Sequence, residues 1–341
     1  MNRSLIVAAA QMDATPAPPD LRCQRAERLL RQAAAAGAQL VVLPELFNLG
    51  YTYADSNFAL AEPPDGPTVA WMRALAASLN IHLAGSLLLR ERGDVFNALL
   101  LFAPNGRFWR YDKLYPWGWE RAYFRRGRDV VIADTDLGHI GLLICWDSAH
   151  RNLWRRFAGQ VDFMAIASCP PQVSNPTYQF ANGQSLTFAQ MGPLLAGLQG
   201  TDRAVFGQMI NEQTAWLGVP AINTVGCGQV QTRLPNARGS LLAMALLWPP
   251  LLKHLPQAEQ MVMTCALTPG CKVVDAAGQI LAERSQAAGE GFALAEIRLA
   301  ASRPQPTAPQ PPSRASWLSY LVSDYVLPLL ASRVYRRGVG M

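Results

Sequence analysis

The sequence predicts an α/β fold in which a pair of mixed β-sheets is flanked by helices. Three observations support this class: short apolar runs recur along the chain, helical patterns separate several of them, and turn signals join others directly. Runs that are apolar on both faces are typical of buried strands, whereas half-exposed strands alternate. The runs are Leu5–Ala10, Leu40–Leu43, Ile81–Leu89, Val95–Phe102, Ile140–Ile144, Val161–Ala167 and Val219–Ile222.

Helical patterns lie between several of these runs. Each begins at a residue whose side chain can accept a hydrogen bond from a free N–H group of the first turn. Each ends at Gly or Asn, which adopt the left-handed conformation readily. The expected helices run from a cap at Asp20 to Gly37, from a cap at Thr68 to Asn80, and from Thr201 to Gly218.

Other strands follow one another with only a turn between them. Gly93-Asp94 separates the runs 81–89 and 95–102, and Pro104-Asn105-Gly106 separates the second run from the short strand at 107–111. Residues of these types are typical of hairpin turns. A sheet that contains both crossovers and hairpins is mixed, so two mixed sheets fit better than one doubly wound parallel sheet.

Length and charge exclude two classes of protein. The 341 residues are enough for a large buried core, so global disorder is excluded. Charged residues make up only 16%, against roughly 25% in an average soluble domain, which indicates large interfaces. The net charge is +6, but residues 302–341 supply four of those charges through five Arg and one Asp. A nucleic-acid-binding domain usually spreads its basic residues over a folded face, so no nucleic acid is expected as a partner.

The cysteines and the N-terminus favour a cytoplasmic protein. The six cysteines show neither close pairing nor a Cys/His zinc spacing, so reduced thiols and no bound metal are expected. The first apolar run resembles a weak secretory signal, but it leads directly into Gln11 and a Pro-containing loop. A buried first strand is therefore the better interpretation. No stretch reaches the roughly 20 apolar residues of a membrane-spanning helix.

Three reactive side chains closely follow predicted strands, namely Glu45, Lys113 and Cys145. The carboxyl ends of strands are where α/β folds form ligand crevices. If the three side chains converge there, the carboxylate can accept a proton from the thiol, and the thiol can act as a nucleophile. The ammonium, together with the backbone N–H of Trp146, can stabilise a developing oxyanion. The pattern therefore indicates thiol-based catalysis.

Three segments resemble the signature blocks of the nitrilase superfamily of carbon–nitrogen hydrolases. They read VVLPELFNLGY at residues 41–51, YDKLYPWGWERAYFRRG at 111–127 and GLLICWDSAHRNLW at 141–154. Their order and spacing are also similar, with 68 residues from the Glu to the Lys and 32 from the Lys to the Cys. Further likeness extends the resemblance over roughly residues 4–299. Three blocks in register are far more specific than any one of them.

The resemblance implies that Glu45, Lys113 and Cys145 are catalytic, and it places a second active-site glutamate on Glu120. It implies attack of the cysteine on an amide carbonyl or nitrile carbon, departure of amine or ammonia, and hydrolysis of a thioester by water activated at Glu45. It implies no metal and no organic cofactor. It also implies a four-layer α-β-β-α sandwich that forms a homodimer or a higher homo-oligomer through a helical face.

Two departures from the family pattern leave the substrate open. Many amidase-type members carry Pro-Glu shortly after the cysteine, where this chain has His150-Arg151-Asn152. The pair Cys145-Trp146 is similar to true nitrilases, but Asp147 replaces the Glu that they commonly carry. For this reason the resemblance does not choose between an amide and a nitrile.

Several residues near the motifs are candidates for a substrate pocket. Aromatic side chains beside the motif residues can line an apolar pocket, although core packing explains each of them equally well. Cys169, which follows the strand at 161–167, is a further candidate, with a buried structural thiol as the alternative. For Glu120 the alternative is a surface ion pair with a neighbouring arginine. The aromatic candidates are Tyr51, Trp117, Trp119 and Trp146.

The chain divides into three parts. A hydrolase-like domain is expected at 1–301 with an apolar insertion at about 227–270, followed by a Pro-rich linker at 302–313 and an apolar, basic tail at 314–341. In the tail, apolar residues share one helical face and arginines follow at the end. This pattern is typical of a peripheral helix on a membrane surface, and equally of a helix that packs on a partner subunit.

Three functions follow from these observations. The first is a cytoplasmic hydrolase that cleaves a small amide or nitrile with a hydrophobic or acyl portion. One form of this hypothesis places the tail on a membrane surface. The second is an N-acyltransferase that passes the acyl group from Cys145 to an amine acceptor. The third is an inactive scaffold protein. The intact trio of Glu, Lys and Cys argues against the third, because nothing structural requires it.

Overall fold

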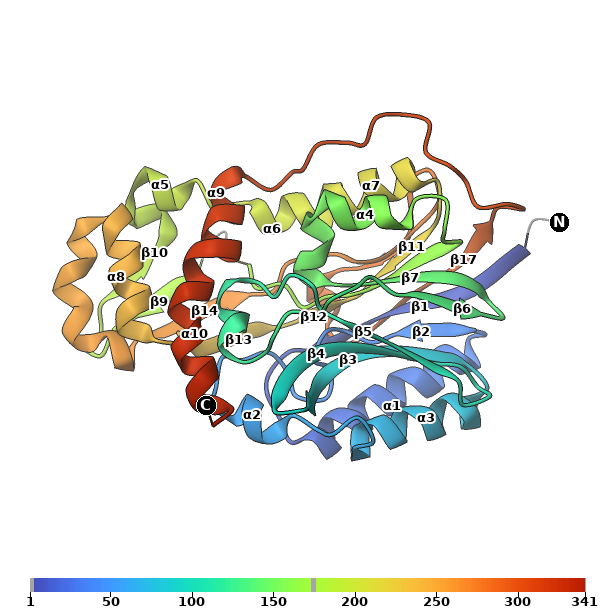
Figure 1. Ribbon diagram of the computed structural model, residues 1–341, viewed down its shortest axis with the longest axis horizontal. Coiled ribbons are helices and arrows are strands. Elements are labelled where there is room, and N and C mark those ends of the chain that lie inside the picture. The colour runs from blue at the N-terminus through green and yellow to red at the C-terminus, as the bar shows by residue number, and fades with distance from the viewer. Residues whose placement is uncertain (1–2, 173–175, 341) are drawn as a thin grey trace.

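Two large mixed sheets lie face to face at the centre of the protein, and helices cover the outer side of each sheet (Figure 1). The structure is a computed structural model that describes residues 3–172 and 176–340. It confirms the predicted α/β class, the two mixed sheets and the four-layer order that the resemblance implies. A third, smaller sheet is an addition that the sequence did not predict.

The first sheet contains the N-terminal strand in a central position, as the continuous apolar run predicts. β1 pairs with β2 in parallel and with β17 antiparallel along most of its length. β3 and β4 form a hairpin at the predicted Gly93 turn, and β4 and β5 form a second hairpin. The strands are β12 (Val225–Cys227), β1 (Arg3–Asp13), β2 (Leu40–Val42), β3 (His82–Glu91), β4 (Asp94–Phe102), β5 (Phe108–Asp112) and β17 (Gly291–Leu299).

The second sheet has its central strands in parallel and its edge strands antiparallel. β7, β8 and β11 run in parallel, whereas β6 and β15 pair antiparallel at either side. In order across the sheet, the strands are β16 (Ile280–Arg284), β15 (Cys271–Val274), β11 (Ala221–Asn223), β8 (Phe163–Ala167), β7 (Gly138–Ile144) and β6 (Ile132–Thr135).

The strands are apolar at successive positions because both faces of each sheet are covered. In β1, residues at odd positions pack into the core between the two sheets, whereas residues at even positions pack under the outer helices. This follows from the alternation of side chains along a strand. The inner set comprises Leu5, Val7 and Ala9, and the outer set comprises Ala8, Ala10 and Met12.

Helices α1 (Pro19–Ala35) and α3 (Pro67–Leu79) cover the first sheet. Both begin one residue before the expected cap residue, so the predicted caps at Asp20 and Thr68 are wrong. A proline at the first helical position needs no N–H partner and has the right φ. In α3 the side chain of Glu62 accepts the hydrogen bond from the Thr68 N–H at 2.8 Å.

Helices on the second sheet include one long helix that the sequence predicted. It comprises α6 (Thr201–Arg203), a π-helical turn η4 (Ala204–Met209) and α7 (Ile210–Leu217), and Gly218 ends it in the left-handed conformation. α4 (Arg151–Phe157) lies beside α7. A short helix, α2 (Ser56–Leu60), lies near the end of the C-terminal helix (Figure 1).

A separate lobe extends from one end of the sandwich (Figure 1). Its four-stranded antiparallel sheet is built from two distant segments, because β9 and β10 precede α6 whereas β13 and β14 belong to the expected insertion. The lobe comprises β9 (Thr177–Gln179), β10 (Ser185–Thr187), η3 (Phe188–Gln190), α5 (Gly192–Ala196), β13 (Gln229–Arg233), α8 (Ala237–Leu247), η5 (Pro249–Gln260) and β14 (Val262–Ala266).

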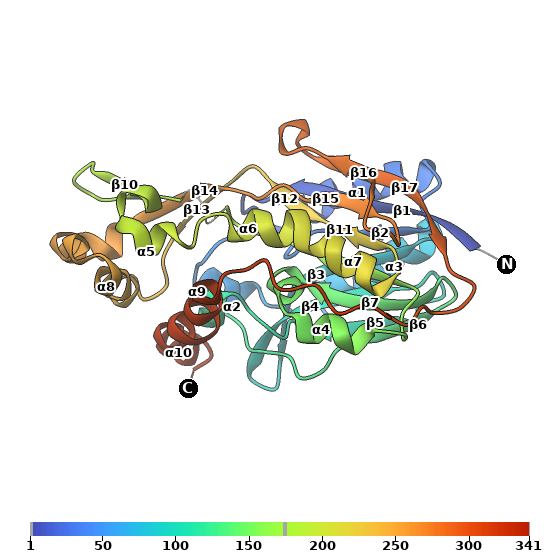
Figure 2. The same ribbon diagram turned by 90° about the horizontal axis from the view of Figure 1, so that it is seen from above.

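The segment after β17 returns along the sandwich to the lobe. It crosses α7 and α4 in extended form, as Figure 2 shows, and the Trp216 indole donates a hydrogen bond to Ala308 O at 2.9 Å. It then forms a helix between the lobe and the sandwich, comprising α9 (Trp317–Tyr320), a π-helical turn η7 (Leu321–Val326) and α10 (Leu327–Gly338). The tail therefore packs against its own chain. Among the described residues, no helix is long and apolar enough to span a membrane.

Candidate active site

A fully buried cation lies between two carboxylates at the carboxyl ends of the strands. Lys113 follows β5, Glu45 follows β2, and Glu120 lies in the 3-10 helix η1 (Gly118–Ala122). Lys113 Nζ is 2.6 Å from Glu45 Oε1 and 2.6 Å from Glu120 Oε2. None of the three residues is more than 2% exposed. The sequence placed Glu45 and Lys113 after strands and the family resemblance added Glu120, and the structure brings the three side chains into contact.

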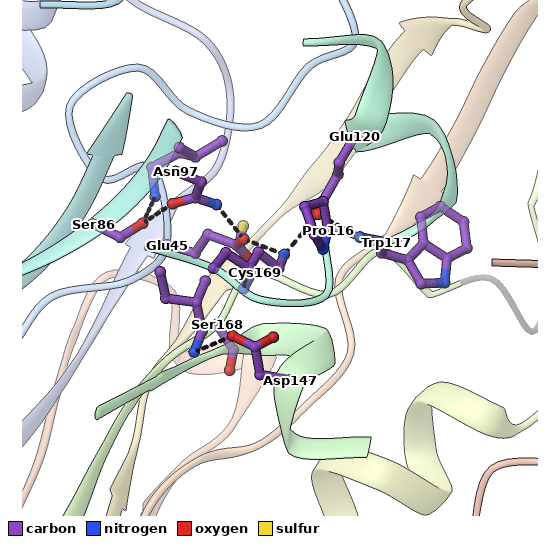
Figure 3. Close-up of polar contacts among 12 residues, drawn as sticks. Glu45, Ser86, Asn97, Pro116, Trp117, Glu120, Asp147, Ser168 and Cys169 are labelled. Carbon is purple, nitrogen blue, oxygen red and sulfur yellow. Dashed lines mark hydrogen bonds and ion pairs between the residues drawn. The ribbon is translucent and has the colours of Figure 1, made fainter. Parts of the chain in front are cut away.

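Further donors hold both carboxylates in place (Figure 3). Glu45 Oε1 accepts a hydrogen bond from Asn97 Nδ2 at 2.8 Å, and Glu45 Oε2 accepts one from the backbone N–H of Cys169 at 3.1 Å. Glu120 Oε1 accepts a hydrogen bond from the Tyr51 hydroxyl at 2.8 Å. Buried carboxylates require such partners, and ionised donors and acceptors form the strongest hydrogen bonds.

Cys145 lies at the sharp turn that follows β7. Its φ is 49°, a left-handed conformation that costs free energy for a residue with a side chain, and the 3-10 helix η2 (Cys145–Ala149) begins there. The buried carboxylate of Asp147 holds this turn. It accepts hydrogen bonds from Ile144 N at 3.2 Å, Tyr111 Oη at 2.7 Å and Tyr115 N at 2.7 Å, and Figure 3 shows its position.

Burial and neighbouring charges shift the pKa values of these groups. Burial disfavours the thiolate and raises the pKa of Cys145 well above 9.0, the Glu45 carboxylate raises it further, and Lys113 opposes both effects. Burial disfavours the Lys113 ammonium, but Glu120 and Glu45 outweigh burial and raise its pKa. Burial raises the pKa of Glu120, whereas Lys113 opposes that increase. In the resting site the cysteine is therefore a thiol beside a charged lysine.

A narrow apolar cavity of about 70 Å³ reaches Cys145 and Glu120. The four aromatic residues that the sequence singled out all line it. Cys169 does not line the cavity, because its backbone N–H bonds Glu45 and its side chain packs in the core. The aromatic lining residues are Tyr51, Trp117, Trp119, Trp146, Tyr178, Phe188 and Phe206.

Comparison of the chain with known proteins identifies its family. The sequence model of the family described as carbon-nitrogen hydrolase matches residues 6–198. The chain belongs to the carbon–nitrogen hydrolase family. A nitrilase of Pyrococcus abyssi is 31% identical over 146 residues, which cover 41% of this chain and 55% of that protein. The bifunctional nitrilase/nitrile hydratase NIT4 of Oryza sativa subsp. japonica is 33% identical over 159 residues, which cover 39% and 43%.

The chain spans about half the length of these curated relatives. Solved structures match over a larger share. A cysteine-to-alanine mutant of the amidase from Nesterenkonia sp. AN1, in complex with butyramide, has a TM-score of 0.61 at 18% identity, with 86% of this chain and 90% of that chain covered. A CN-hydrolase superfamily protein from Xanthomonas campestris, XC1258, has a TM-score of 0.60 at 20% identity, with 88% and 91% covered. At these identities the likeness shows the shared fold.

In this member of the carbon–nitrogen hydrolase family, the C-terminal helix closes one side of the cavity. Ser319, Val322, Ser323 and Leu327 all line it. Asp324, on the same helix, accepts hydrogen bonds from Trp146 Nε1 at 3.1 Å and pairs with a nitrogen of His150 at 2.9 Å. His150 is therefore engaged by the tail.

Sequence reasoning missed several residues of the site. Asn97 lies within an apolar run, and a buried amide among apolar residues is a signal that it has a specific partner. Asp147 was noted only as a departure from the family pattern, although it holds the cysteine turn. The sequence did not indicate that Asp324 belongs to the site, because a single acid in an amphipathic tail is interpreted only as a polar residue. In the part of the chain that the structure describes, no three His, Cys, Asp or Glu residues are grouped as metal ligands.

Proposed function

We propose that the protein is a thiol-dependent carbon–nitrogen hydrolase that cleaves a small linear amide or nitrile through a thioester on Cys145. The observation that carries this proposal is the buried contact of Lys113 with Glu45 and Glu120 beside a cysteine that opens into an apolar cavity. Burying three ionisable groups is costly, and the fold has no structural need for them, so a catalytic role explains their presence.

Acylation begins with proton transfer from the thiol. Because the pKa of Cys145 is raised, the thiol needs a base, and the charge of Glu45 acts on it directly. As Glu45 takes the proton, the sulfur forms a bond to the carbonyl carbon and the C=O electron pair moves to oxygen. Lys113 stabilises that oxyanion. The C–N bond then breaks, the nitrogen takes the proton from Glu45, and ammonia or an amine leaves.

Deacylation reverses the roles with water. Glu45 removes a proton from water, the oxygen forms a bond to the thioester carbon, and the oxyanion is again stabilised by Lys113. The C–S bond breaks and the sulfur takes the proton back from Glu45, which leaves a free carboxylic acid. A nitrile passes through a thioimidate and consumes one more water. Glu120 holds Lys113 in position through the contact at 2.6 Å and so serves as a positioning residue.

The dimensions of the cavity support a substrate with a short acyl portion. Its volume of about 70 Å³ is less than half of the roughly 150 Å³ that holds a benzene ring in an engineered apolar cavity. Aromatic walls favour methylene groups over charged ones along most of its length. The relatives that the chain resembles are named nitrilases and an amidase, and the amidase was solved with the small amide butyramide.

A second candidate function is acyl transfer from the same thioester to an amine. The observation that favours it is the C-terminal helix, four of whose residues close one side of the apolar cavity, because a mostly apolar wall beside the thioester disfavours water. Product analysis separates the two functions: hydrolysis yields the free acid whether or not an amine is present, whereas transfer yields a new amide that requires the amine.

The test of the proposed function is intact-mass spectrometry of the protein mixed with short aliphatic amides and nitriles. We expect an acyl adduct and steady turnover in the wild type, both absent in Cys145→Ala. Cys23→Ala, which removes a cysteine on the helical side of the first sheet, is the matched control and retains both. Turnover that survives in Cys145→Ala overturns the mechanism. Absence of any adduct across the panel, in folded protein, favours the scaffold function instead.

Two expectations about partners stay predictions. The tail helix packs on its own chain but leaves Trp317, Leu321, Tyr325 and Leu329 exposed at intervals of four residues. Such a stripe fits a bilayer surface or a second copy of the chain. Sedimentation velocity measures self-association, and flotation with vesicles that contain anionic lipid measures membrane contact.

A further inference from the structure

A second carboxylate, that of Asp202, belongs to the wall of the same cavity. Asp202 is only 4% exposed and lies at the start of the long helix on the second sheet. Its Oδ2 accepts a hydrogen bond from the Thr268 hydroxyl at 2.7 Å. Its Oδ1 has no hydrogen-bond partner among the described residues. A buried carboxylate oxygen that lacks a donor is costly, so Oδ1 of this cavity-lining residue has an unfilled requirement for one.

The neighbouring cation, the guanidinium of Arg203, forms its hydrogen bonds with another residue, Gln172. With the Gln172 amide oriented so that its oxygen accepts, Arg203 Nε and Nη2 lie 3.2 and 2.9 Å from that oxygen. Burial raises the pKa of Asp202, whereas the bond to Thr268, the N–H groups at the helix start and the charge of Arg203 oppose that increase and favour the charged form. Glu120, the other acid that lines the cavity, is already paired with Lys113.

The surroundings of Asp202 suit a ligand with several donors. Three residues with aliphatic hydroxyl groups, Thr201, Ser319 and Ser323, line the same cavity, whose other walls are mostly apolar. Thr201 Oγ1 and Ser319 Oγ lie 2.7 Å apart. A primary ammonium carries three N–H donors, which a carboxylate and hydroxyl oxygens lining the same cavity can accept. A neutral alkyl group at this position leaves Asp202 Oδ1 without a partner.

We propose that Asp202 binds a primary ammonium group at the far end of the substrate's acyl portion. The substrate class is then a short ω-amino amide or ω-amino nitrile, whose methylene groups lie along the aromatic walls. This inference rests on the proposed function for the location of the scissile bond. A primary amide or a nitrile releases only ammonia, so the ammonium group belongs to the acyl portion that stays on Cys145.

The test compares two amides of equal length. 4-Aminobutanamide carries an ammonium group where pentanamide carries a methyl group. We expect the wild type to prefer the amino amide in kcat/KM. Asp202→Asn should lower kcat/KM for the amino amide by about ten- to a hundredfold, as expected for loss of a hydrogen bond between charged groups. The value for pentanamide should change by less than about threefold, because no charge contacts its methyl group.

The matched control is Asp129→Asn, which removes an acid whose side chain is 79% exposed. It should leave the ratio of the two substrates unchanged. An equal fall for both amides in Asp202→Asn, or a wild type that prefers pentanamide, overturns the ammonium site. Pentanamide turnover in Asp202→Asn also reports that the variant is folded.

A binding measurement separates this inference from the proposed function. In Cys145→Ala, which cannot react, calorimetry should detect 4-aminobutanamide, and the added change Asp202→Asn should weaken binding by at least tenfold. If binding depends on Asp202 but no acyl adduct forms in wild-type protein, the hydrolase proposal fails while the ammonium site stands. If an adduct forms but Asp202→Asn does not weaken binding of 4-aminobutanamide, the ammonium site fails and the hydrolase proposal stands.

Discussion

Asp324 on the C-terminal helix accepts a hydrogen bond from the indole nitrogen of Trp146 at 3.1 Å, although 178 residues separate them in the chain. Trp146 directly follows Cys145 and lines the cavity. The second oxygen of Asp324 pairs with His150 at 2.9 Å. The tail therefore determines the position of an aromatic wall beside the nucleophile, so a change in the tail should alter substrate selection.

We expect Asp324→Ala to loosen this wall. Trp146 loses its acceptor and His150 its partner, so KM for a short amide should rise about three- to tenfold, as loss of one or two buried hydrogen bonds predicts. The kcat value should change less, because no reacting atom is touched, and larger amides should gain relative to smaller ones. Steady-state kinetics over a series of chain lengths measures this. Tyr325→Ala, at a residue 67% exposed on the same helix, should behave as wild type.

Lys113→Met should remove both activity and stability. The oxyanion loses its cation, and the buried carboxylates of Glu45 and Glu120 lose the charge that compensates them. Loss of one partner from a buried ion pair costs about 3–5 kcal/mol of unfolding free energy. Urea unfolding followed by fluorescence measures the change, and Lys253→Met, at an exposed lysine, is the control. A variant with full stability would show that the cluster is not ionised as described.

The pH profile of Cys145 alkylation should reflect its raised pKa. Because burial and the charge of Glu45 raise that pKa above 9.0, labelling by iodoacetamide should still be increasing with pH at pH 9. In Glu45→Gln the nearby negative charge is lost, so the profile should move to lower pH. Mass spectrometry of the labelled peptide gives the profile. An apparent pKa below 8 in the wild type would contradict the description of a resting thiol.

Lys272 should make the protein more stable at alkaline than at neutral pH. Burial lowers its pKa from 10.5 to about 8, so between these values the unfolded chain binds more protons than the folded chain. Stability then rises with pH across that window. At pH 7 the buried charge costs about 3 kcal/mol, and loss of the Lys272 bond to Gly207 O offsets about 1 kcal/mol of that.

Lys272→Met should therefore stabilise the protein by about 1–2 kcal/mol at pH 7, with the gain disappearing toward pH 10.5. Urea unfolding at several pH values measures both quantities. A gain that is constant with pH would mean that packing, rather than charge, is responsible.

Most of the sandwich could be predicted because its signals are local. β1 is apolar at successive positions since side chains alternate between two covered faces, and the sequence alone shows that pattern. The turn before β4 and the end of the long helix at Gly218 follow from the backbone preferences of single residues. The predicted starts of α1 and α3 were wrong by one residue. At each start a proline stands beside a polar residue that could cap the helix, and the sequence pattern does not decide between them.

The site could be predicted only where the strand ends converge. Glu45, Lys113 and Cys145 each follow a strand, and sheet geometry brings such ends together. Asn97 could not be assigned to Glu45, because the two residues lie 52 positions apart and an amide within an apolar run does not indicate its partner. Asp147 likewise supports the cysteine turn through contacts with Tyr111 and Tyr115 that depend on how two sheets pack.

The amino-acid order alone was therefore enough to establish the layers, the strand that carries each motif and the family resemblance. Only the tertiary structure decided that the C-terminal helix closes the cavity and that Asp202 shares that cavity with Cys145. The physical reason is that the hydrophobic effect has no direction. An amphipathic tail shows that one face will be buried, and a lone acid shows that it needs a partner, but the surface and the partner emerge only when distant segments pack together.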